Sequence, residues 1–128
     1  MNKCVKIVIL LSFVLLCIIG CTAQPQKYSD PGQEIEIVSG EEFIIGLESN
    51  PTTGFEWLTE FDESFLEPVK SEYETDKALS GMTGVGGEQQ FTFKGLKPGK
   101  TKITLKYKRE WEQAAADTKI FTVSIKEQ

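Results

Sequence analysis

The side chains that most often carry catalysis are scarce in this 128-residue sequence, and histidine is absent. A Ser-His-Asp triad, a Cys-His pair within the chain and a histidine-ligated metal site are therefore excluded. Cysteine occurs only at Cys4, Cys17 and Cys21. The remainder of the chain can thus form no internal disulfide and no thiolate metal site. We expect no enzyme activity, no metal and no other cofactor.

Carboxylates are plentiful, but their setting does not favour acid–base catalysis. The pairs Glu41–Glu42 and Glu110 with Glu112 have no basic partner in their motifs, so solvated charge is the better interpretation. In total, 19 acidic residues exceed 14 basic ones, which gives a net charge of -5. Because an acidic chain lacks the positive field that nucleic-acid phosphates require, we expect no nucleic-acid partner.

The first 20 residues have the pattern of a secretion signal. Lys3 and Lys6 precede an apolar run, Ile7 to Ile19, whose 13 residues suit a signal peptide and are too few for a spanning helix. The junction Gly20-Cys21 resembles the cleavage box of bacterial lipoproteins, which implies cleavage before Cys21 and a lipid on its thiol. An uncleaved anchor or an ordinary secreted protein remains the alternative. The lipid would hold the protein in the cell envelope, on a membrane outside the cytoplasm.

The rest of the sequence shows the period-two alternation of half-buried strands. We expect a lipidated tether over residues 21–33 and one folded domain over residues 34–128. Gly and Pro turns separate the alternating runs, and no long helical period follows residue 21. The pattern predicts an all-β, immunoglobulin-like antiparallel sandwich of about seven strands. The runs cover residues 35–37, 43–47, 55–57, 65–69, 91–93, 103–107 and 121–125.

The two tryptophans have different settings. Trp57 lies in an alternating run, so we expect it in the core. Trp111 follows Arg109-Glu110 in a polar segment. It either folds back on the sandwich or serves as a binding anchor, since tryptophan and arginine are enriched at interface hot spots.

Three loop segments have unusual content, and together they carry a resemblance to a known family. They are Asn50-Pro51-Thr52-Thr53-Gly54-Phe55, Gly84-Val85-Gly86-Gly87 and Arg109-Glu110-Trp111. In this order and spacing, across roughly residues 33–127, they resemble the chagasin family of cysteine-peptidase inhibitors. The resemblance implies an immunoglobulin-like sandwich whose three loops enter and block the active-site cleft of papain-like peptidases reversibly.

The resemblance also implies a role for each loop. The first segment would be the central wedge, with Thr52 nearest the catalytic thiol and imidazole of the peptidase. The glycine-rich segment would run along the non-primed side through backbone hydrogen bonds, and Arg109 and Trp111 would dock on the primed side. The family often has proline where this chain has Glu110, which predicts a less rigid third loop.

A second function is compatible with the same fold. An immunoglobulin-like lipoprotein can also act as a surface-binding module or adhesin that inhibits nothing. A papain-like cysteine peptidase and a membrane, reached through the N-terminal lipid, are the partners that we expect, and we expect a monomer.

Overall fold

The computed structural model describes residues 24–75 and 86–128, which form an all-β sandwich. The segment with Cys21, like Gly84 and Val85, lies outside these residues. Within them no helix has the length and apolar character needed to cross a bilayer. The eight described strands are β1 (Gln26–Tyr28), β2 (Ile35–Val38), β3 (Glu42–Ser49), β4 (Phe55–Phe61), β5 (Leu66–Thr75), β6 (Gly87–Gly95), β7 (Gly99–Arg109) and β8 (Asp117–Lys126).

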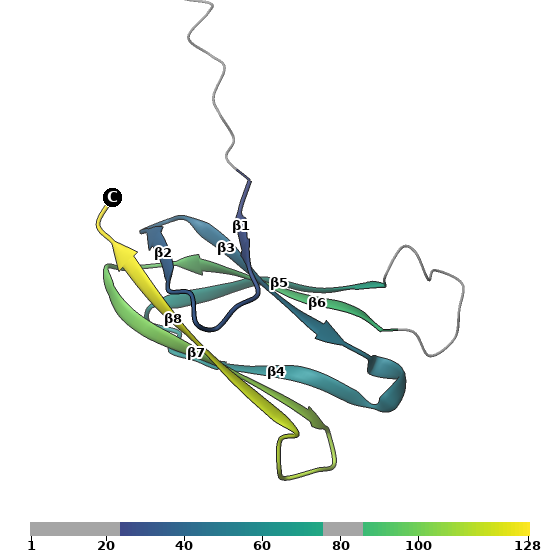
Figure 1. Cartoon of the computed structure of the whole chain (residues 1–128). Coiled ribbons are helices and arrows are strands. Elements are labelled where there is room, and N and C mark those ends of the chain that lie inside the picture. The colour runs from purple at the N-terminus through teal and green to yellow at the C-terminus, as the bar shows by residue number, and fades with distance from the viewer. Residues whose placement is uncertain (1–23, 76–85) are drawn as a thin grey trace, which may run out of the picture.

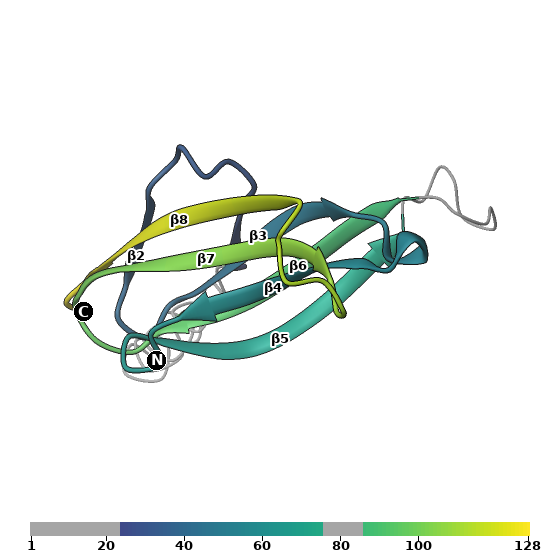
Figure 2. The same ribbon diagram turned by 90° about the horizontal axis from the view of Figure 1, so that it is seen from below.

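The strands form two four-stranded sheets that face each other (Figures 1 and 2). The first sheet has the order β1-β3-β6-β5, and the second has the order β2-β8-β7-β4. The pairs β3–β6, β5–β6, β4–β7 and β7–β8 are antiparallel. The pairs β1–β3 and β2–β8 at two sheet edges are parallel. The immunoglobulin-like sandwich is confirmed, with parallel pairs at two edges of an otherwise antiparallel structure.

Strand β1 corrects the expected extent of the tether. Residues 26–28 were predicted to be part of an irregular tether, but they pair with β3 in the register Gln26–Phe43 to Tyr28–Ile45. The Tyr28 side chain is buried, and its ring packs edge-on against Phe43 with centroids 6.5 Å apart. The sandwich therefore begins at least eight residues earlier than the domain start predicted at residue 34, and it has one strand more than predicted.

The core lies between the sheets and follows from the alternation of apolar and polar residues. The alternation of buried and more exposed side chains is clearest in β2, β7 and β8, as period-two patterning requires. Phe93 of the first sheet stacks on Phe43 and meets Phe61 of the second sheet edge-on, with centroids 5.0 Å apart. The largest fully buried side chains are Phe43, Phe93, Phe121, Ile35, Ile45, Leu66, Ile103, Leu105 and Val123. Burying each such side chain stabilises the fold by about 1.5–3 kcal/mol.

Two predicted core features can be compared with the structure directly. Trp57 is 4% exposed, which confirms its place in the core. The run at residues 65–69 does contain a strand, but β5 begins at Leu66, extends to Thr75 and buries only Leu66. Its pairing with β6 is irregular between Pro68 and Lys70, as is common where an edge strand carries a proline.

Candidate functional site

The three predicted loop segments meet at one end of the sandwich, as far as the structure describes them. Ser49, the last residue of β3, pairs with Gly87, the first residue of β6, and Gly87 also pairs with Thr75 at the end of β5. In the second sheet, Phe55 at the start of β4 pairs with Arg109 at the end of β7. Figure 1 shows these strand ends on one side of the molecule. The sheet registers therefore bring the first loop (residues 50–55), the described base of the second (residues 86–87) and the third (residues 109–111) together.

The first loop crosses from one sheet to the other in a compact turn. Pro51–Thr53 form a single 3-10 turn, and Gly54 ends it with a φ of 82°, a conformation that favours glycine. The amide of Gly54 donates to the Pro51 carbonyl at 3.0 Å. The Thr52 hydroxyl donates to the Asn50 side-chain oxygen at 2.5 Å, and the exposed loop thus presents an oriented hydroxyl at its tip.

The second loop is described only at its base, where Gly86 and Gly87 lie. A Cβ at Gly87 would come within 2.2 Å of the Glu74 carbonyl oxygen, so this position has no room for a side chain. A Cβ at Gly86 would lie 3.5 Å from the Ser49 carbonyl oxygen, next to the start of the first loop. Gly87 therefore allows β5 and β6 to approach closely, whereas the position of Gly86 has room for a Cβ at ordinary contact distance.

Trp111 of the third loop lies against the first loop and not against the core. Its side chain is 73% exposed, yet the ring edge lies 3.0 Å from the position that a Cβ on Gly54 would occupy. A large aromatic surface thus stands beside the exposed turn, at the same end of the sandwich. This arrangement fits a binding anchor better than a side chain folded back on the sandwich.

Arg109 joins the third loop to the first. Its Nε donates to the Thr53 carbonyl at 3.1 Å, and a terminal nitrogen lies 3.3 Å from a carboxylate oxygen of Glu112. The guanidinium carbon is 4.3 Å from the centroid of the Phe55 ring and 5.8 Å from that of the Trp111 ring. In this structure Arg109 therefore makes its contacts within the chain.

The third loop, which has Glu110 in place of a proline, is restrained by hydrogen bonds. The Glu112 amide donates to the Arg109 carbonyl at 3.1 Å, and the Ala116 amide donates to the Tyr107 carbonyl at 2.7 Å. Glu110 itself is exposed. Backbone bonds and the Arg109–Glu112 pair thus hold this loop, although it lacks the fixed φ of proline.

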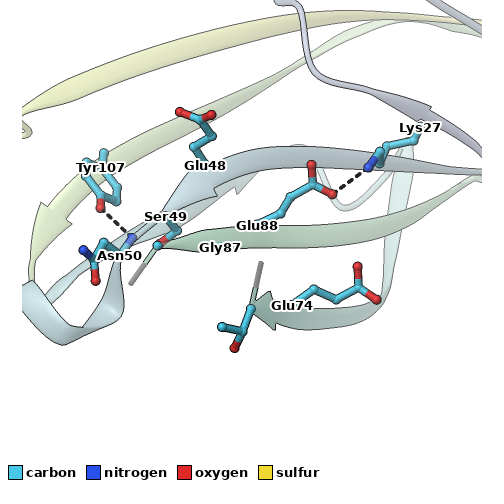
Figure 3. Close-up of a pocket in the computed structure, with 10 residues that line it drawn as sticks. Lys27, Glu48, Ser49, Asn50, Glu74, Gly87, Glu88 and Tyr107 are labelled. Atoms are coloured by element: carbon cyan, nitrogen blue, oxygen red, sulfur yellow. Dashed lines mark hydrogen bonds and ion pairs between the residues drawn. The ribbon is translucent and has the colours of Figure 1, made fainter. Parts of the chain in front are cut away.

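Two supporting residues were not predicted from the sequence. Tyr107 stacks between Phe55 and Trp57, with centroid distances of 5.2 and 4.9 Å, and its hydroxyl accepts a hydrogen bond from the Asn50 amide at 3.1 Å (Figure 3). Gln89 of the first sheet bonds both backbone groups of Trp57 in the second sheet, at 3.0 and 3.2 Å. Both side chains brace the strands from which the first loop emerges.

A groove of about 880 Å³ lies beside the first loop (Figure 3). Its charged lining consists of Glu48, Glu74, Glu88 and Lys27, and Lys27 pairs with Glu88 at 2.7 Å. Two pKa shifts arise elsewhere. Burial raises the pKa of Tyr28, and hydrogen bonds from Ser64 lower the pKa of Asp62. Among the described residues, no three Cys, Asp or Glu side chains gather as metal ligands would. The loop end therefore offers shape, exposed apolar area and hydrogen bonds, which are means of binding a partner.

Known proteins are similar to this chain in sequence. The family model of chagasin family peptidase inhibitors, I42, matches residues 36–125, which is most of the chain. Amoebiasin-1 of Entamoeba histolytica is 36% identical over 91 residues, covering 71% of this chain and 86% of the relative. Chagasin of Trypanosoma cruzi is 32% identical over 101 residues, covering 74% of this chain and 89% of the relative.

A solved structure has the same fold. The crystal structure of EhICP2, a cysteine protease inhibitor from Entamoeba histolytica, superposes with a TM-score of 0.66 at 23% identity. The match covers 81% of this chain and 99% of that one. The family match and the two relatives above 30% identity show that this chain belongs to the chagasin family of cysteine-peptidase inhibitors.

Proposed function

We propose that this inhibitor blocks papain-like cysteine peptidases reversibly by placing its first loop in the active-site cleft, with the second and third loops on either side. One observation carries the proposal: the exposed turn of the first loop, the glycine base of the second and the exposed Trp111 ring lie together at one end of a rigid sandwich. Loops held by a rigid scaffold are a common way to present binding residues.

The chemistry of the first loop suits such a cleft. Papain-like enzymes hold a thiolate–imidazolium pair there. Because the Thr52 hydroxyl donates a hydrogen bond to Asn50, its oxygen still has lone pairs that can accept a hydrogen bond from an imidazolium. The Pro51–Thr53 turn is helical and not extended, and Pro51 reduces the conformational entropy lost on binding. The loop can therefore fill the cleft as a preorganised wedge.

An inhibition panel tests this function. The domain of residues 22–128 should inhibit papain and cathepsins that cleave a fluorogenic peptide, competitively and with activity regained on dilution. Thr52→Arg should abolish inhibition, because a long charged side chain at the loop tip would clash in a narrow cleft. Ser29→Arg adds the same charge at an exposed position outside the loops and should inhibit normally. Failure of the unmodified domain at micromolar concentration across several such enzymes would refute the proposal.

Membership of the chagasin family of inhibitors favours this function over that of a non-inhibitory adhesin. The two roles give opposite results in the same panel. A domain that leaves every papain-like enzyme active, yet is recovered from envelope extract with one non-peptidase protein, would establish the adhesin role.

We also propose that the inhibitor is a lipoprotein of the cell envelope, anchored through Cys21. The support is the short apolar run and the Gly20-Cys21 junction of the sequence. Two or three acyl chains would give stable anchoring, which one chain does not. Cys21→Ser in the full chain should move the protein from the membrane fraction to the soluble fraction. Retention of Cys21→Ser in the membrane fraction would contradict lipidation.

A further inference from the structure

The first loop is held at both of its ends by side chains of one neighbouring strand. Tyr107 and Arg109 are two residues apart on β7, so their side chains leave the same face of that strand. At the start of the loop the Tyr107 hydroxyl accepts from the Asn50 amide at 3.1 Å. At the other end Arg109 Nε donates to the Thr53 carbonyl at 3.1 Å.

Phe55 connects these two contacts. Its ring stacks on Tyr107, with centroids 5.2 Å apart, and the Arg109 guanidinium carbon lies 4.3 Å from the same ring. Tyr107, Phe55 and Arg109 therefore form one stack below the loop. This stack fixes the direction in which β7 presents its two hydrogen-bonding groups, since neither side chain can rotate without losing its contact with the ring.

Glu112 completes the arrangement. Its carboxylate lies 3.3 Å from a terminal nitrogen of Arg109, while the Nε–H of the same guanidinium points to the first loop. Arginine can make both contacts at once because its donors form a planar fork, and a lysine ammonium cannot reproduce that geometry. Arg109 thus already has a partner for its Nε–H and for one terminal nitrogen, and a ring contact, within the chain before any peptidase arrives.

We propose that Tyr107 and Arg109 are positioning residues that hold the first loop in its binding shape from its two ends, and that Glu112 keeps Arg109 turned toward the loop. This inference rests on the proposed function for its effect on inhibition. It changes the role that the family resemblance implies for Arg109, from a docking group on the peptidase surface to an internal brace. Trp111 remains the exposed contact of the third loop.

The test uses the domain of residues 22–128 with Tyr107→Phe, Arg109→Lys and Arg109→Gln. Glu60→Gln is the matched control, because it breaks a 2.8 Å ion pair with Lys106 on the outer face of the same strand pair. Two quantities are measured for each variant: hydrogen exchange of the loop amides in the free domain, by NMR, and the rates of association with and dissociation from papain at several salt concentrations.

All three variants should exchange loop amides faster in the free domain. Tyr107→Phe should accelerate Asn50, and the Arg109 variants should accelerate Thr53 and Gly54. Each should weaken inhibition by about three- to tenfold, as expected for the loss of one hydrogen bond, mainly through faster dissociation. Arg109→Lys should be no better than Arg109→Gln, and the salt dependence of association should not change. The control should match the unmodified domain in every measurement.

Opposite results would overturn the inference. If Arg109→Lys inhibits fully while Arg109→Gln is weaker and less sensitive to salt, Arg109 acts as a charge on the peptidase. Unchanged amide exchange in all three variants would show that the loop does not depend on the brace. If the unmodified domain inhibits no peptidase, the proposed function fails, but the exchange rates of the free domain still decide whether β7 positions the loop.

Discussion

Gly54 and Gly40 provide a matched pair of substitutions that separates stability from inhibition. Both have positive φ, 82° and 90°. A Cβ on Gly54 would meet the Trp111 ring edge at 3.0 Å, whereas a Cβ on Gly40 would have nothing within 4 Å. Gly40 lies at the opposite end of the sandwich, where its amide bonds the carbonyl of Gly95. Alanine at either position therefore introduces the same backbone strain, but only at Gly54 does it disturb the predicted contact surface.

The expected magnitudes follow from these contacts. A left-handed alanine costs about 1–2 kcal/mol, so each variant should lower the Tm by roughly 5–10 °C. Moving the exposed Trp111 ring by a few tenths of an ångström adds little to that cost, because the ring packs against few neighbours. Truncation of a tryptophan hot spot weakens binding by about thirtyfold, so the smaller displacement of the ring in Gly54→Ala should weaken inhibition by up to about tenfold.

Thermal unfolding followed by circular dichroism and an inhibition assay with papain measure the two effects. Gly54→Ala should be a poor inhibitor and Gly40→Ala a normal one, at similar Tm. Equal and undiminished inhibition by both variants would refute the idea that the contact between Gly54 and Trp111 forms part of the binding surface. Weak inhibition by both would show that global stability, and not loop geometry, controls the assay.

Three further predictions concern the scaffold. Gln89→Ala should destabilise the domain by about 1–3 kcal/mol in chemical denaturation, because both backbone groups of the buried Trp57 lose their partner. Gly87→Ala should lower the Tm and weaken inhibition, since its Cβ would collide with the β5 backbone. An unchanged Tm and unchanged inhibition would contradict the close approach of Gly87 to the Glu74 carbonyl. Ser64→Ala should return the pKa of Asp62 part of the way to its usual value in an NMR titration, because the hydrogen bond from the Ser64 hydroxyl is the largest cause of the lowering, while the backbone amide at position 64 and Lys97 remain. Asp62 therefore stabilises the domain above its unfolded-state pKa, and this contribution is lost as the pH falls through the lowered pKa; an unchanged titration curve for Ser64→Ala would contradict the assignment.

The alternation of apolar residues predicted most of the strands because burial of one sheet face is a local, period-two property. Strand β1 was not predicted from the alternation, since Gln26-Lys27-Tyr28 contains a single apolar side chain. Its strand character comes from parallel pairing with β3, a contact between segments distant in sequence. The outer part of β5 was missed for a similar reason: the strand is exposed beyond Leu66 and is defined by its pairing with β6.

The site was predictable only in part. Composition and spacing marked the three segments as unusual loops, but their gathering at one end was implied by the family resemblance and became visible through the strand registers. Tyr107 had been assigned to a strand like any other alternating residue, and Gln89 was not singled out. Both act through partners on other strands, and Glu112 was interpreted as solvated charge because its partner Arg109 is recognised only once the turn is formed.

The parallel pairing of β1 has a consequence for how an anchored inhibitor would face its surroundings. Gln26 pairs with Phe43 near the start of β3, whereas the first loop follows the end of β3. The chain thus enters the sandwich at the end remote from the three loops. Five residue steps join Cys21 to Gln26, a stalk of at most about 18 Å. A lipid on Cys21 would therefore hold the end of the sandwich where β1 begins close to the bilayer. The three loops, at the opposite end, would face the aqueous space, where they would bind peptidases that diffuse past the membrane.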